Sequence, residues 1–169
     1  CKIIDTPTGN DYIEMRAKGF EKISPQRKYH GISTQIIAQI KNVRVPFNVD
    51  IGVGDIIVPR AEERTINTQL PDFEAPVIKT YSLESTIAEK FDAILQRFEL
   101  TGRMKDFYDI YYLSRTFDFE GAKLQAAIFE TLQRRGTPYD RDSFKRVVAL
   151  ADDEDMQKRW KFFLKTIKD

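Results

Sequence analysis

Apolar and polar residues alternate with a period of two over much of the stretch from Tyr12 to Val58, which predicts β-strands. In residues 31–40 the side chains on one face are those of Ile32, Thr34, Ile36, Ala38 and Ile40. Residues 41–42 suit a tight turn, and residues 43–51 then repeat the alternation. The pattern predicts an antiparallel hairpin with a core face and a polar face. Pro46 lacks an N–H, which indicates an unpaired position or a bulge on the second strand.

After Thr80 the apolar spacing changes to that of helices. Ser82 is the expected N-cap of a first helix, and its apolar stripe comprises Leu83, Ile87, Phe91, Ile94, Leu95 and Phe98. A second helix is expected from about Thr101 through Leu113, apolar around most of its circumference and therefore buried.

A third helix is expected from about Glu120 to Arg135, where Gly136-Thr-Pro138 would end it. The final segment places Met156, Trp160, Phe163, Leu164 and Ile167 at helical spacing. The acidic run 152–155 suits the start of this helix, because the helix dipole favours negative charge there.

Residues 60–76 contain two prolines and no clear periodicity, so they are interpreted as a connecting loop and the boundary between two domains. The expected division is a sheet domain at residues 1–76 and a helical domain at residues 77–169. The predicted fold class is α+β, with an antiparallel or mixed sheet followed by a helical bundle.

Composition narrows the class of protein. The chain has 169 residues, 41% of them hydrophobic, and its 27 basic side chains nearly balance 26 acidic ones, so any phosphate binding must come from a local patch. The one cysteine, Cys1, has no internal disulfide partner, and no apolar run is long enough to span a bilayer. We therefore expect a soluble cytoplasmic protein. Because the chain begins with Cys1 instead of Met, we also expect the natural start to be missing.

Lys90 and a pair of aspartates are the first candidates for a functional site. Lys90 falls at the edge of the first helical stripe, so its stem can lie on apolar surface while its ammonium reaches a phosphate. The alternative is a surface lysine paired with a carboxylate. Asp106 and Asp109 share one face of the second helix, three residues apart.

Basic residues at helical spacing accompany both aspartates. Arg103 precedes Asp106 by three residues and Lys105 precedes Asp109 by four, which permits ion pairs within the helix. One interpretation is a lattice of ion pairs that stabilises the helix. The other is that one aspartate orients Lys90 while Arg103 or Lys105 faces phosphate.

Asp50 is a third candidate, near the end of a predicted strand and on its polar face. Gly52 and Gly54 follow it, which leaves room for a ligand beside the backbone, and a strand carboxylate suits Mg²⁺ in a phosphoryl-transfer site. A single carboxylate is weak support for a metal site, and Asp55 is expected to cap a turn instead. His30 is the only histidine and is interpreted as a strand or turn residue. The aromatic stripe that includes Tyr108, Tyr111 and Tyr112 is interpreted as core.

Several ordered segments carry a resemblance to a known family. They are Val49-Asp-Ile-Gly-Val-Gly-Asp55, Tyr81-Ser-Leu-Glu through Ala88-Glu-Lys90, Arg103-Met-Lys-Asp-Phe-Tyr-Asp109 and Arg134-Arg-Gly-Thr-Pro138. Together they resemble the AbiEii/AbiGii toxin family of nucleotidyltransferases, from about Tyr29 to Pro138 and more loosely to Trp160.

The resemblance implies a DNA polymerase β-like nucleotidyltransferase that moves a nucleotide from an NTP with Mg²⁺. The implied biological setting is a bacterial toxin–antitoxin or phage-defence pair, with a tRNA-like RNA acceptor and a cognate antitoxin. Asp50 resembles the strand carboxylate of the metal site, and Lys90 resembles the triphosphate-binding lysine. Asp106 or Asp109 resembles the acid of the last motif.

One motif of the family is absent from this sequence. No Asp-x-Asp preceded by a pair of small residues occurs before Asp50; the sequences Asp140-Arg-Asp142 and Asp153-Glu-Asp155 lie downstream, outside strand patterns. We therefore expect the chain alone to be an inactive fragment of an enzyme. Two other hypotheses stay open: a module that binds protein or RNA without catalysis, and a structural remnant whose charges pair with one another.

Overall fold

The computed structural model describes residues 4–6, 12–23, 30–54 and 56–167, except for the side chains of His30 and Glu99. The expectations for Cys1 and Asp55 and for the side chain of His30 lie outside this description. The chain forms two compact units, Cys1–Asp55 and Ile56–Asp169. The α+β class is confirmed, since strands dominate the first unit and helices the second. The expected domain division at residue 76 stays a prediction.

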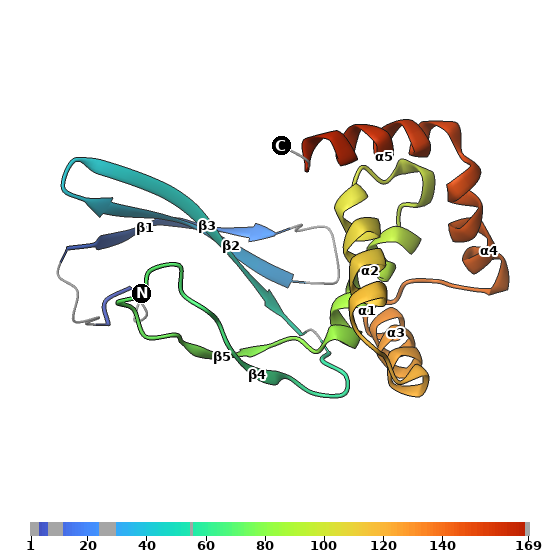
Figure 1. The fold of residues 1–169 in the computed structure, drawn as a ribbon, viewed down its shortest axis with the longest axis horizontal. Coiled ribbons are helices and arrows are strands. Elements are labelled where there is room, and N and C mark those ends of the chain that lie inside the picture. Colours follow the sequence, from blue (N-terminus) through green and yellow to red (C-terminus); the bar gives the residue numbers. More distant parts are fainter. Residues whose placement is uncertain (1–3, 7–11, 24–29, 55, 168–169) are drawn as a thin grey trace. The chain divides into compact units, whose positions relative to one another are not determined.

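The first unit contains an antiparallel sheet of three strands in the order β1 (Glu14–Ile23), β2 (His30–Ile40) and β3 (Val43–Val53) (Figure 1). The predicted hairpin is β2–β3, paired without a shift from His30 opposite Val53 to Ile40 opposite Val43. The pairing of β1 with β2 shifts between Ala17 and Gly19, as in a β-bulge.

Pro46 lies opposite Ile37 in an unbroken stretch of pairing. Of the two alternatives for Pro46, the bulge is therefore wrong, and the irregularity lies on β1 instead. Among the described strands, β3 pairs only with β2, so its other edge is unpaired. Pro46 has no N–H, and if that position faces the unpaired edge, no hydrogen bond between strands is lost.

The alternation predicted a buried core face, but most apolar side chains on this face of the sheet are exposed. Thr34 and Ile36 are buried, with 5% and 8% of their surface accessible. Other members of the face are exposed: Met15, Phe20, Ile32, Ile40, Val43, Val45, Phe47, Ile51 and Val53. The sequence predicted the correct face, but a single sheet layer offers its side chains few neighbours to pack against.

Short strands begin the second unit. β4 (Glu62–Thr65) pairs antiparallel with β5 (Val77–Thr80). The predicted connecting loop at residues 60–76 is wrong over β4, whose sequence Glu-Glu-Arg-Thr has no apolar alternation to reveal it. β4 is held in place by pairing with residues distant in the sequence; Glu62, for example, lies opposite Thr80.

The helices of the second unit follow the predicted order. They are α1 (Leu83–Leu95), α2 (Met104–Thr116), α3 (Gly121–Arg135), α4 (Arg141–Ala149) and α5 (Glu154–Thr166), with 3₁₀ turns η1 (Phe98–Leu100) and η2 (Leu150–Asp152). Figure 1 shows α1 beside α3 and α2. The short helix α4 was not predicted from the sequence.

A small core joins α1, α2, η2 and α5. Its buried members are Ile94, Met104, Leu150 and Met156, and Phe107, Ile110, Val147, Trp160 and Phe163 pack against them. Tyr108 contacts the rings of Trp160 and Phe163. Tyr111 and Tyr112, however, are 61% and 52% exposed, so their interpretation as core is wrong. The expected burial of α2 is wrong too, since only Met104 and Asp106 of this helix are buried.

Caps fix the helix ends where the sequence placed them. Ser82 Oγ accepts a hydrogen bond from the N–H of Ser85, which confirms the N-cap of α1. Asp153 caps α5 by accepting from the N–H of Met156 at 2.8 Å. At the end of α3, Gly136 adopts a φ of 65°, in the left-handed region that favours glycine.

Asp140 caps α4, and its carboxylate gives this cap a pH dependence. It accepts from the N–H of Ser143 at 2.7 Å, and this hydrogen bond lowers the pKa of Asp140 below its ordinary value. Because the folded-state pKa is depressed, the stabilisation is present above the unfolded pKa and is lost as the pH falls through the folded pKa.

We expect Asp140→Asn to retain most of the cap and Asp140→Ala to lose it, because asparagine also accepts from the backbone. The difference in stability between the wild type and Asp140→Asn should vanish once the pH falls below the lowered pKa. Thermal unfolding of the three proteins between about pH 2 and pH 7 measures it. An identical pH profile for the wild type and Asp140→Asn would contradict this role of the carboxylate.

Every helix among the described residues is too short or too polar to cross a bilayer.

Candidate functional site

The start of α1 is fixed to the segment before β4 by serine hydroxyls. Ser82 and Ser85 have 0% and 1% of their surface exposed. Both hydroxyls donate to the carbonyl of Val58, and Ser85 Oγ also accepts the N–H of Val58 at 2.7 Å. The Tyr81-Ser-Leu-Glu-Ser85 segment therefore anchors the helix that carries Lys90.

Lys90, on α1, lies between two carboxylates of α2. Its Nζ is 2.7 Å from Asp109 Oδ2 and 3.6 Å from Asp106 Oδ1. Lys90 is 21% exposed and Asp109 is 25% exposed, whereas Asp106 is only 3% exposed. The ammonium is thus held on one side by buried charge and remains within reach of solvent on the other.

Arg103 brings a second cation to Asp106. Its Nε lies 2.7 Å from Asp106 Oδ2, and its Nη2 donates to Oδ1 over 3.4 Å. The Nε contact is an ion pair without hydrogen-bond alignment, so the buried Oδ2 atom receives no aligned hydrogen bond from any described residue. The Arg103 side chain is 56% exposed, so it can rotate toward a ligand without leaving a buried position.

Lys105 lies on the exposed side of α2. The expected ion pair between Lys105 and Asp109 is wrong, because within the described residues Asp109 pairs with Lys90. The spacing of four residues permitted the pair, but a partner on the neighbouring helix takes the carboxylate.

A second cluster of charge, which sequence reasoning missed, involves Asp92, two residues after Lys90 on α1. Asp92 is fully buried and accepts hydrogen bonds from Gln96 at 2.9 Å, from Arg135 at 3.1 Å and from the hydroxyl of Thr137. Arg135 also lies 3.2 Å from Glu89. This network joins α1 to the end of α3 on the same helix that presents Lys90.

The sequence held a signal for this cluster. Asp92 occupies a buried position of α1 in register with Ser85 and Ala88, at the spacing of a helix face. An aspartate within a buried stripe requires a cation or several donors, and Arg134-Arg-Gly-Thr-Pro138 supplies them at the end of α3.

Asp50 belongs to the first unit, on β3, where it is exposed and lies opposite Ser33 of β2. Lys90, Asp106 and Asp109 belong to the second unit and meet there, so their convergence with Asp50 stays a prediction. Among the described residues no three histidine, cysteine or acidic side chains lie close enough to hold a metal ion. These residues therefore do not by themselves form the expected Mg²⁺ site.

A protein-family model described as "Nucleotidyl transferase AbiEii toxin, Type IV TA system" matches residues 2–169. The chain belongs to this family. The resemblance to AbiEii nucleotidyltransferases inferred from the ordered segments is thus confirmed, and the family implies a nucleotide substrate and a cognate antitoxin. Neither the curated proteins nor the solved structures gave a match.

The segments that resemble the AbiEii family lie in distinct elements. The Asp50 segment is the end of β3, the Lys90 segment begins α1, the Asp106 segment begins α2, and Arg134–Pro138 ends α3. The Lys90 segment contacts the Asp106 segment through Lys90 and the Arg134–Pro138 segment through Glu89, which pairs with Arg135. The side chains that sequence reasoning selected in this unit are therefore neighbours, with the exception of the solvent-facing Lys105.

Proposed function

We propose that this AbiEii chain carries the triphosphate-binding part of a nucleotidyltransferase that moves NMP from an NTP to a tRNA-like RNA acceptor. The observation that carries the proposal is the position of Lys90, whose ammonium is fixed by Asp106 and Asp109 yet partly exposed. An ammonium has three donors, so two carboxylate partners leave one for a phosphate oxygen.

The charged residues of the site then take separate roles. Lys90 donates to the phosphate chain and steadies the charge that develops on the leaving pyrophosphate. Asp106 and Asp109 orient the ammonium and act through it, so they are positioning residues. Arg103 and Lys105 lie on the exposed side and supply further positive charge to the phosphates.

The remaining parts of the proposal rest on membership of the AbiEii family. They are a polymerase β-like sheet domain followed by a helical bundle, Asp50 as a carboxylate of the metal site, and Mg²⁺ as the metal. Because the described residues do not assemble a Mg²⁺ site, we assign no step to the ion. The chain has no Asp-x-Asp before Asp50, so we expect these residues alone to bind nucleotide without transferring it.

The biological setting follows from the same source. We propose a cytoplasmic bacterial toxin with a cognate antitoxin, in a system for phage defence. Basic and acidic residues nearly balance over the chain, so an RNA acceptor would be held by local contacts and not by a general positive field.

Binding of inorganic tripolyphosphate tests the role of Lys90 without requiring turnover. We expect Lys90→Gln to lower the affinity about tenfold, since a charge-assisted hydrogen bond to phosphate is lost. Arg103→Ala removes an exposed cation that pairs with Asp106, and we expect a loss of about threefold. Isothermal titration calorimetry measures both, below the unfolding temperature of each variant.

Lys145→Ala is the matched control, because Lys145 is an exposed lysine paired with Asp142 on α4. Its affinity for tripolyphosphate should equal that of the wild type. If Lys90→Gln and Arg103→Ala both bind as the control does, the charges of α1 and α2 serve structure alone and the proposal fails. A normal rate of nucleotide transfer to tRNA by these 169 residues would overturn the expectation that they are inactive alone.

A further inference from the structure

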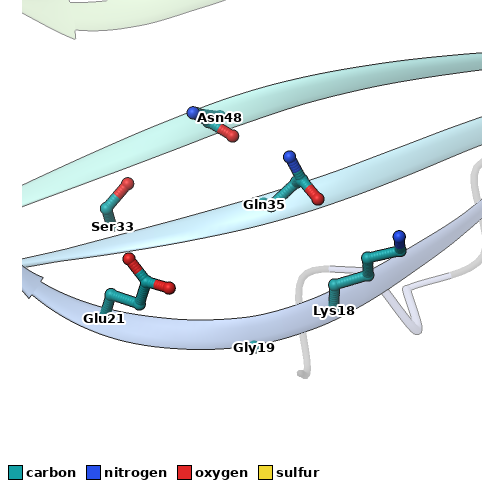
Figure 2. Close-up of a pocket in the computed structure, with 6 residues that line it drawn as sticks. All are labelled: Lys18, Gly19, Glu21, Ser33, Gln35 and Asn48. Carbon is teal, nitrogen blue, oxygen red and sulfur yellow. The ribbon is translucent and has the colours of Figure 1, made fainter.

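The polar face of the three-stranded sheet contains a hollow that the proposed function does not use. Its volume is about 230 Å³, and it is lined by Lys18, Gly19, Glu21, Ser33, Gln35 and Asn48. Figure 2 shows these residues on β1, β2 and β3. The bulge between Ala17 and Gly19 places Lys18 as the extra residue beside the hollow, an arrangement that often re-aims a side chain toward a ligand.

The polar side chains of the hollow are free to bind a ligand. Within the described part of the chain, no hydrogen bond or ion pair engages the side chains of Lys18, Glu21, Ser33, Gln35 or Asn48. On the opposite face, by contrast, the hydroxyl of Thr34 donates to the carbonyl of Gly19 at 2.8 Å. The buried Thr34 hydroxyl therefore has a hydrogen-bond partner, whereas the donors and acceptors on the polar face are available to a ligand.

The amides of the hollow form a matched pair. Gln35 and Asn48 are direct cross-strand partners, which places their Cβ atoms about 5 Å apart. Each amide offers a donor and an acceptor side by side, the arrangement that pairs with the edge of a nucleobase. Asn48 precedes Asp50 by two residues on β3, so both lie on one face about 7 Å apart.

The other groups of the hollow suit a sugar. Glu21, Ser33 and Asp50 occupy one row across the three strands. Ionised Glu21 only accepts hydrogen bonds, so it favours a ligand with hydroxyl donors, such as the ribose of a nucleoside. No apolar or aromatic side chain lines the hollow, which indicates recognition by hydrogen bonds at the edges of the ligand.

We propose that this hollow binds a nucleoside, with Gln35 and Asn48 selecting the base and Glu21 accepting from the ribose. The inference rests on the proposed function, which makes a nucleotide the substrate. It adds a nucleoside-binding surface on the first unit and names the residues there that would discriminate between bases.

Gly19 provides a way to close the hollow without disturbing the sheet. A Cβ added there meets no atom within 4 Å, and Gly19 lies opposite Gln35 on the same face. The side chain of Gly19→Val would therefore extend into the open space of the hollow, and valine suits a strand.

Nuclear magnetic resonance of the whole chain tests the proposal with adenosine, guanosine, cytidine and uridine at millimolar concentration. We expect one base to be preferred and the side-chain amide signals of Gln35 and Asn48 to shift on titration. Gln39 is the internal control: it lies on the same face of β2, four residues from Gln35, and donates to the carbonyl of Lys41 at 2.9 Å. Its signal should not move.

Variants then separate this proposal from the triphosphate site. Gln35→Ala and Asn48→Ala should reduce the preference between bases about tenfold, and Gly19→Val should abolish nucleoside binding, while Gln39→Ala changes neither. All four should bind tripolyphosphate normally. If tripolyphosphate binds and depends on Lys90 but no nucleoside shifts the amide signals, this inference is overturned and the proposed function stands. If nucleosides bind as expected but tripolyphosphate does not depend on Lys90, the hollow is supported and the triphosphate site fails.

Discussion

Replacing Asp92 by alanine is expected to lower the free energy of unfolding by about 3–5 kcal/mol, because it removes one partner of a buried ion pair. Asp92 is fully buried and accepts from Gln96, Arg135 and Thr137. Without the carboxylate, the guanidinium loses its buried partner although it still lies 3.2 Å from Glu89, and the buried hydroxyl of Thr137 loses its acceptor. Urea unfolding followed by circular dichroism measures the loss.

Two further variants define the cause of that loss. Asp92→Asn keeps the shape of the side chain but not its charge, so we expect a smaller loss of about 1–3 kcal/mol. Asp118→Ala removes an exposed aspartate from the connection between α2 and α3, and should change stability by less than about 0.5 kcal/mol. Equal stabilities for Asp92→Ala and Asp118→Ala would show that the network contributes nothing.

The second large effect is expected at Lys90. Lys90→Met should lower the free energy of unfolding by about 2–4 kcal/mol, because Asp106, 3% exposed, then keeps Arg103 as its one cationic partner among the described residues. Adding Asp106→Leu should restore part of the stability, since replacing both members of a buried pair by apolar residues is often close to neutral.

A double-mutant cycle with Lys90→Met and Asp106→Leu measures this coupling, which we expect to be about 1–3 kcal/mol. Asp109 is unchanged in all members of the cycle and, being 25% exposed, reaches water. Strictly additive losses would mean that the pair is not coupled. In that case Asp106 would not orient the lysine, and its role as a positioning residue would be lost.

Local chemistry explains which parts of the fold the sequence predicted. The alternation of β2 and β3, the cap at Ser82 and the stop at Gly136 depend on neighbouring residues, and the structure confirms each of them. β4 could not be predicted, because its pairing with β5 depends on residues about fifteen positions away and its own sequence has no period. The exposure of Tyr111 likewise depends on how helices pack, which the spacing of apolar residues does not specify.

The candidate site was predictable in part for a similar reason. Lys90, Asp106 and Asp109 are charges beside apolar positions, and such charges require partners, so they could be selected and do lie together. Asp92 satisfies the same criterion, but its partners Arg135 and Thr137 lie 43 and 45 residues along the chain, and the spacing of residues within one helix does not predict such contacts. The pairing of Lys105 with Asp109 failed because helical spacing shows which contacts are possible within a helix, and not which partner on another helix competes for them.

The turn at Gly136 has a consequence for engineering this protein. The N–H groups of Gly136 and Thr137 donate to the carbonyls of Gln133 and Leu132, and this turn delivers the hydroxyl of Thr137 to Asp92. Exchanging glycines for alanine is a common way to make proteins resist heat, by reducing the disorder of the denatured chain. At Gly136 that strategy would fail, because a methyl group disfavours the backbone angle that aims the threonine.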